Sequence, residues 1–135
     1  MKKSLFALIF SLIATMSFAQ KYEYQLSSHI LDVSKGKPAV GINITLEKLN
    51  EQSKIWSVID EKITDSNGRI SDFLPSEKDN TGIYKLTYFT APYFEQSNTE
   101  SFYPFITVVF EIADGQHYHV PITLSAYGYS TYRGN

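Results

Sequence analysis

Short runs of alternating apolar and polar residues, separated by turn-forming residues, constrain this sequence more than any other feature. Alternation is clearest at residues 40–47 and 105–112, where every second side chain is apolar. Alternate residues of a strand face opposite sides of a sheet, so the pattern predicts strands with one buried face. Aromatic and β-branched residues are abundant, and no stretch after residue 19 keeps helical spacing for long. The sequence therefore predicts an all-β fold.

Turn-forming residues separate the predicted strands. The strands are expected at residues 25–33, 40–49, 55–63, 69–73, 83–89, 105–112 and 117–124. Seven to eight short strands with regular turns favour a two-sheet sandwich over a barrel, although spacing alone does not separate the two. Residues 90–98, which include Pro92, are the one candidate for a short helix.

The first nineteen residues have the pattern of a signal peptide. Lys2 and Lys3 precede an apolar run at residues 5–16, and Ala19 completes a small, large, small pattern at residues 17–19. The run is shorter than the ~20 apolar residues that a membrane-spanning helix needs. We expect cleavage after Ala19 and an exported protein, periplasmic in a double-membraned bacterium. Residues 20–135 then form a single domain.

Composition excludes several classes of partner. Losing Lys2 and Lys3 with the signal peptide lowers the formal net charge from −2 to −4. A mildly acidic chain is not suited to nucleic acid or to an anionic membrane, both of which attract clustered basic residues. The chain has no cysteine, so stability must come from core packing or from association between chains, and no thiol nucleophile exists.

Three histidines are the main candidates for chemistry. His117 and His119 are two residues apart on a predicted strand and therefore share one face. Three interpretations compete: hydrogen-bonded structural histidines, zinc ligands together with His29, or a group that transfers protons. Taken alone, His29 is best explained as a structural histidine.

The remaining candidates lie in a turn and at the chain end. Arg69 follows the turn at Asn67 and Gly68, and such arginines are commonly solvated. The chain ends on aromatic and cationic residues, although chain ends are normally frayed and chemically inert. We therefore expect this end to form part of a site. No Ser-His-Asp arrangement, phosphate loop or paired-carboxylate motif is identifiable.

Five sequence blocks together resemble one family. The blocks are LSSHILDVSKGKPA, TDSNGRI, GIYKLTYFTAPYF, FYPFITVVFEI and HYHVPITLSAYGYSTYRGN. In this order they resemble the 5-hydroxyisourate hydrolases, the transthyretin-related enzymes of urate breakdown. The resemblance covers essentially all of residues 20–135.

The resemblance implies a set of site residues. Its catalytic positions fall on His29, Arg69 and His119, whereas His117 does not fall on the essential histidine of the family. The terminal tetrapeptide, which is implied to bind substrate, falls on Tyr132, Arg133, Gly134 and Asn135. Asn135 replaces the usual serine. A role that needs a hydrogen-bonding side chain or the terminal carboxylate is retained, whereas a role that needs a hydroxyl group is lost.

The resemblance also implies a reaction and an assembly. The reaction is hydrolysis of 5-hydroxyisourate to 2-oxo-4-hydroxy-4-carboxy-5-ureidoimidazoline, with water attacking a cyclic amide carbonyl and no metal or cofactor. The implied fold is a sandwich of two four-stranded sheets with a short helix. The implied assembly is a tetramer, a dimer of dimers, with active sites at the interface between the two dimers. The alternatives are an exported transthyretin-like protein that binds a small ligand without catalysis, and a three-histidine zinc hydrolase.

Overall fold

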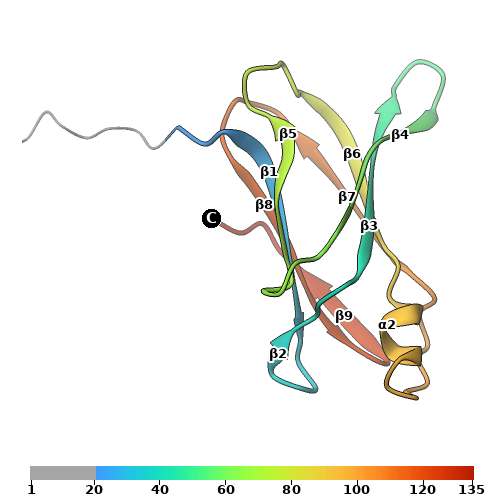
Figure 1. Ribbon diagram of the computed structural model, residues 1–135. Coiled ribbons are helices and arrows are strands. Elements are labelled where there is room, and N and C mark those ends of the chain that lie inside the picture. The colour runs from blue at the N-terminus through green and yellow to red at the C-terminus, as the bar shows by residue number, and fades with distance from the viewer. Residues whose placement is uncertain (1–20) are drawn as a thin grey trace, which may run out of the picture.

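The computed structural model describes residues 21–135 and forms a sandwich of two β-sheets (Figure 1). Its strands are β1 (Tyr24–Asp32), β2 (Lys37–Pro38), β3 (Asn43–Asn50), β4 (Ile55–Ile63), β5 (Arg69–Pro75), β6 (Gly82–Tyr88), β7 (Ile106–Ile112), β8 (Tyr118–Ser125) and β9 (Gly128–Thr131). A short helix, α2 (Ala91–Glu95), follows β6. The predicted all-β sandwich with one short helix is confirmed.

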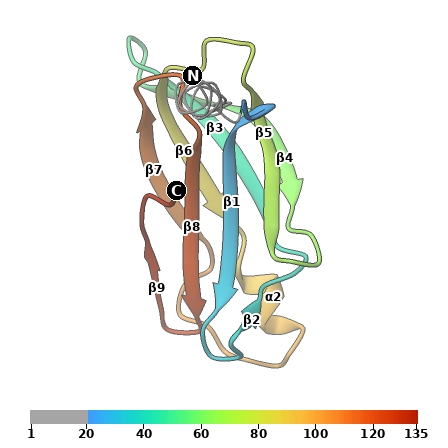
Figure 2. The same cartoon turned by 90° about the vertical axis from the view of Figure 1, so that its left-hand side faces the viewer.

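The two sheets differ in how their strands pair. One sheet has the order β4-β3-β6-β7, and the other has the order β2-β1-β8-β9 with β5 also paired to β1 (Figure 2). β5 pairs with the first part of β1, and β2 pairs with its last two residues. β1 and β8 run parallel, whereas the other pairs of described strands run antiparallel. β1 therefore lies between β5 and β8 at the centre of its sheet.

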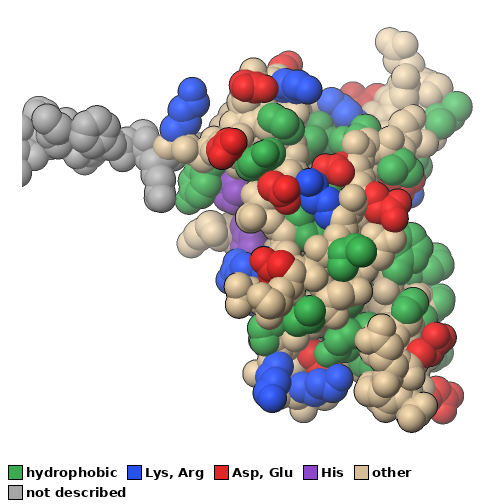
Figure 3. Space-filling model, in the orientation of Figure 1, with side chains coloured by type: hydrophobic (Ala, Val, Ile, Leu, Met, Phe, Trp, Pro, Cys, Tyr) green, Lys and Arg blue, Asp and Glu red, His purple; other side chains and the backbone are tan. Residues whose placement is uncertain are grey.

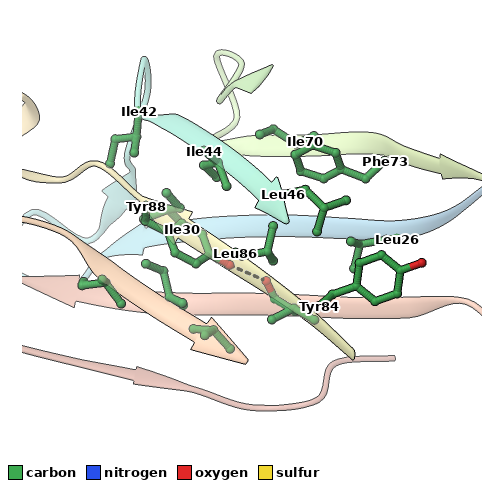
Figure 4. Packing of buried hydrophobic residues seen from close by; sticks show 14 of the residues in the cluster. Leu26, Ile30, Ile42, Ile44, Leu46, Ile70, Phe73, Tyr84, Leu86 and Tyr88 are labelled. Carbon is green, nitrogen blue, oxygen red and sulfur yellow. Dashed lines mark hydrogen bonds between the residues drawn. The ribbon is translucent and has the colours of Figure 1, made fainter. Parts of the chain in front are cut away.

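The core lies between the sheets and explains the alternation in the sequence. Apolar side chains from β1, β3 and β6 point toward one another (Figure 4). They include Leu26, Ile30, Ile44, Leu46, Leu86 and Tyr88, all fully buried. Burying one such side chain contributes roughly 1.5–3 kcal/mol. Because these residues of β1 face the core, the residues between them face outward from the sandwich.

Three features differ from the sequence-based expectation. β2 is only two residues long, and β9 follows β8 after a tight turn, so neither gave a separate alternating pattern. The helix ends at Glu95 rather than near residue 98. Asn98 adopts a positive φ of 49°, a left-handed conformation that cannot continue a helix.

The predicted signal peptide, residues 1–19, lies outside the described residues. Among the residues that the structure describes, no helix is long and apolar enough to cross a membrane.

Candidate functional site

The three predicted catalytic residues lie on the outer face of the β1-containing sheet. His29 and Arg69 are register partners on β1 and β5. His119 lies on β8, beside Ser27 of β1. His29 and His119 are half-buried and Arg69 is exposed. Histidine side chains lie at the left-hand edge of the molecule in Figure 3, with a basic side chain directly below them. Segments about 90 residues apart in sequence therefore meet at one surface because β1 pairs with both β5 and β8.

A tight turn places Arg69 beside β1. Gly68 donates its N–H to the Asp65 carbonyl over 2.9 Å and has a φ of 68°. Its own carbonyl accepts the N–H of Ile30 over 2.9 Å. A Cβ atom at Gly68 would lie 2.8 Å from the Ile30 carbonyl oxygen. Gly68 is suited to this position for two reasons: it can adopt a left-handed backbone conformation, and it can approach β1 closely. This turn places Arg69 opposite His29.

The environment of His29 favours the neutral imidazole. Burial is the largest cause that lowers the pKa of His29, and the positive charge of Arg69 lowers it further. A hydrogen bond with the backbone of Asn67 and the charge of Asp65 raise this pKa, but they do not overcome the first two causes. His29 is therefore poised as a neutral group near pH 7.

The pKa of His119 is also lowered, and more neighbouring groups contribute to the shift. Burial lowers its pKa most, followed by the charges of Arg69 and His29. His117 also lowers the pKa of His119, while a hydrogen bond with the backbone of Ser27 raises it. A neutral imidazole keeps one unprotonated nitrogen, which is what a general base requires.

We expect the substitution Arg69→Gln to raise the pKa of both His29 and His119, since it removes a positive charge that disfavours each imidazolium. NMR titration of the ring C–H resonances measures this directly. Arg133→Gln is the matched control, because Arg133 is not among the charges that shift His119. Equal shifts in both variants, or no shift in Arg69→Gln, would contradict the assignment.

The same pKa values determine a pH dependence of stability. Each histidine has a folded-state pKa below its unfolded value of ~6.5, so the unfolded chain binds more protons between those two values. Stability is fully present above that window, and it is lost as the pH falls from about 6.5 through the folded-state pKa values.

The last residues of the chain contact His119. Gly134 donates its backbone N–H to the His119 carbonyl over 2.9 Å and forms an isolated bridge with that residue. A Cβ atom at Gly134 would overlap the His119 imidazole ring. Only glycine fits at this position without displacing the ring.

The other terminal residues lie around this contact. The guanidinium carbon of Arg133 is 4.7 Å from the centre of the Tyr118 ring. Arg133 and Asn135 line a hollow of about 560 Å³ together with Gly134, Lys21, Tyr22, Ser76, Gly115, Gln116 and His117. Tyr132 is 61% exposed and lines a different hollow, next to β7. The substrate-binding roles of these four residues stay predictions.

Sequence reasoning missed Ser27 and set His117 aside, yet the Ser27 hydroxyl contacts the rings of both His117 and His119. The Ser27 hydroxyl lies 2.8 Å from His119 Nδ1 and 2.9 Å from His117 Nε2. Ser27 shares a strand face with His29, and this position was the one signal in the sequence that pointed to it.

The three-histidine zinc arrangement does not form within one chain. Across residues 21–135, no group of three or more His, Cys, Asp or Glu side chains has the geometry to hold a metal ion. Both ring nitrogens of His117 already have hydrogen-bond partners, Ser27 and the Tyr24 carbonyl.

Comparisons with known proteins place these residues in context. A family model described as "Transthyretin: HIUase/Transthyretin family" matches residues 26–134. A Caenorhabditis elegans protein named as a probable 5-hydroxyisourate hydrolase is 43% identical over 134 residues, 96% of this chain and 98% of that protein. The Mus musculus 5-hydroxyisourate hydrolase is 37% identical over 111 residues, 82% of this chain and 94% of that protein.

Two solved structures have the same fold. Klebsiella pneumoniae 5-hydroxyisourate hydrolase has a TM-score of 0.69 and 34% identity, covering 82% of this chain and 98% of that one. Sea bream transthyretin in complex with thyroxine has a TM-score of 0.76 and 25% identity, covering 82% of this chain and 94% of that one.

Proposed function

This chain belongs to the HIUase/transthyretin family, and from that membership we propose that it hydrolyses 5-hydroxyisourate, the substrate in the names of its relatives. The observation that carries the proposal is the convergence of His29, Arg69 and His119 on one sheet face, with both imidazoles held neutral. This arrangement combines proton acceptors with a fixed positive charge, as hydrolysis of an acyl bond requires.

The proposed chemistry is attack of water on a cyclic amide carbonyl. One imidazole, His119 or His29, removes a proton from the water as its oxygen bonds to the carbonyl carbon. The carbonyl oxygen becomes an oxyanion, and Arg69 stabilises it through its rigid donor fork. The ring C–N bond then breaks, and the imidazolium returns its proton to the departing nitrogen. The imidazole is neutral again, so the step balances without a metal or a cofactor.

The terminal residues have a proposed binding role. Arg133 and Asn135 line the hollow beside His117, where they can donate hydrogen bonds to the polar edge of a planar substrate. Tyr132 lines the other hollow, next to β7, and its ring is largely exposed, so contact between this ring and the substrate is proposed to require a second chain.

We propose that the active assembly is a homotetramer, built as a dimer of dimers. Within one chain the site lies on an open sheet face, so a second chain facing it would shield the substrate from bulk water. We further propose that residues 1–19 direct export to the periplasm. Light scattering of the purified protein tests the first proposal, and the amino-terminal sequence of the secreted protein tests the second.

The deciding experiment follows 5-hydroxyisourate by its ultraviolet absorbance. Freshly generated substrate should disappear faster with the protein than it does spontaneously, and the excess rate should scale with protein concentration. A rate equal to the spontaneous one, accompanied by saturable binding of the substrate, would favour a small-ligand binding protein instead. Metal analysis of the active protein tests the zinc alternative.

A further inference from the structure

A chain of hydrogen bonds joins His119 to the backbone of β1 through two residues that have no role in the proposed chemistry. His117 Nδ1 lies 3.0 Å from the Tyr24 carbonyl oxygen. His117 Nε2 lies 2.9 Å from Ser27 Oγ. Ser27 Oγ in turn lies 2.8 Å from His119 Nδ1. We call Tyr24, His117, Ser27 and His119, in this order, the relay.

The first contact fixes the tautomer of His117. A carbonyl oxygen only accepts hydrogen bonds, so His117 Nδ1 must carry the proton that it donates to Tyr24. A neutral imidazole has one N–H, so Nε2 of His117 is then an acceptor. Tyr22 stacks on the His117 ring, with centroids 4.2 Å apart and planes inclined by 21°, and this contact holds the ring in its orientation.

The two contacts of Ser27 fix the tautomer of His119 in turn. A serine hydroxyl has one proton, and Ser27 must donate it to the acceptor nitrogen of His117. Ser27 Oγ is then an acceptor toward His119, so His119 Nδ1 must be the donor. The single proton of neutral His119 is consequently on Nδ1. Its Nε2 carries an unprotonated lone pair.

We propose that Ser27 and His117 are positioning residues, which hold His119 in the Nδ1–H tautomer so that Nε2 is the base that accepts the proton of water. This inference rests on the proposed hydrolytic function. The proposed chemistry allows either His119 or His29 as the general base. The relay ends on His119, and we therefore assign the base to His119. The opposite tautomer of His119 requires Ser27 to donate to Nδ1, which leaves the relay complete only if His117 is a cation.

The relay also stabilises the product of proton transfer. When His119 Nε2 takes a proton from water, the ring becomes an imidazolium with Nδ1–H still directed at Ser27. A hydrogen bond from a charged donor is stronger than one from a neutral donor, so the contact strengthens as charge develops. Arg69 and His29 lie close enough to oppose that charge, which makes the compensating contact with Ser27 more important.

The tautomer is tested in the unmodified protein by long-range ¹H–¹⁵N correlation of the histidine rings at neutral pH. We expect the Nδ1–H pattern for both His117 and His119. An Nε2–H pattern at His119 would overturn the proposal. This measurement needs no variant and no substrate.

Substitution then tests the catalytic consequence. Ser27→Ala should lower kcat by roughly 10–100-fold, a loss of the size found when the hydrogen-bond partner that orients a metal-ligating histidine is removed, with little change in KM. It should also leave His119 with mixed tautomers. Ser27→Thr keeps the hydroxyl and should recover much of the rate. Ser130→Ala is the matched control, because it removes a hydroxyl of the same sheet whose one hydrogen-bond partner among residues 21–135 is Thr123.

The outcomes separate the relay from the proposed function. If the native protein hydrolyses 5-hydroxyisourate and Ser27→Ala keeps full kcat while folded, the relay has no positioning role and the function stands. If the native protein is inactive and His119 shows the Nδ1–H pattern, the hydrolase proposal fails while the tautomer assignment holds. A thermal transition matching that of Ser130→Ala shows that Ser27→Ala is folded.

Discussion

The substitution His119→Ala is expected to lower kcat for 5-hydroxyisourate by roughly 10²–10⁴-fold, the usual contribution of a general base. His119 is half-buried on β8, its pKa is lowered by burial and by Arg69, and its Nδ1 is occupied by Ser27. Removing the ring therefore removes the proton acceptor that the relay orients. The rate is measured by ultraviolet absorbance after subtraction of the spontaneous decay.

The control for this loss lies on the same strand. Thr123 shares the outward face of β8, and its hydroxyl bonds to Ser130 over 2.6 Å, away from the histidines. Thr123→Ala should keep the native rate. His29→Ala supplies the comparison that identifies the base. If His119→Ala keeps most of the rate and His29→Ala does not, the base is His29 and the relay proposal fails with it.

Much of the sandwich could be predicted because the core imposes a period of two on the sequence. Ile44 and Leu46 are buried, while the residues between them face outward, and that alternation is visible without coordinates. β2 could not be predicted, because a two-residue strand has no period. The parallel pairing of β1 with β8 was also beyond the sequence, since no local pattern specifies which distant strand completes a sheet.

The candidate site was predicted more completely by resemblance than by residue chemistry. Chemistry alone ranked His29 as structural and Arg69 as solvated, because the pairing that brings them together depends on the β1–β5 register. Ser27 was missed because a serine on a strand has no distinctive pattern. Its role follows from two distances to ring nitrogens, which only a three-dimensional structure supplies. His117 precedes β8 rather than lying on it as predicted, but its ring and that of His119 both contact the Ser27 hydroxyl, so the predicted common face is confirmed.

The second large effect concerns the chain end, where deletion of residues 133–135 is expected to abolish activity while the sandwich stays folded. The core residues and β9 all precede the deletion, which removes the hydrogen bond from Gly134 to the His119 carbonyl and the contact of Arg133 with the Tyr118 ring. One such bond contributes about 0.5–1.5 kcal/mol. The melting temperature should therefore fall by only on the order of 4 °C.

Two further variants distinguish what the tail contributes. Gly134→Ala keeps the tail length but places a Cβ atom against the His119 ring, so it should lower kcat by displacing the base. Arg133→Gln leaves that contact intact and should mainly raise KM, because Arg133 lines the hollow and its guanidinium lies over the Tyr118 ring. If the truncated protein unfolds, the tail is a structural element. If it folds and retains the native rate, residues 133–135 have no part in the site, and the substrate must be bound by the β1, β5 and β8 residues alone.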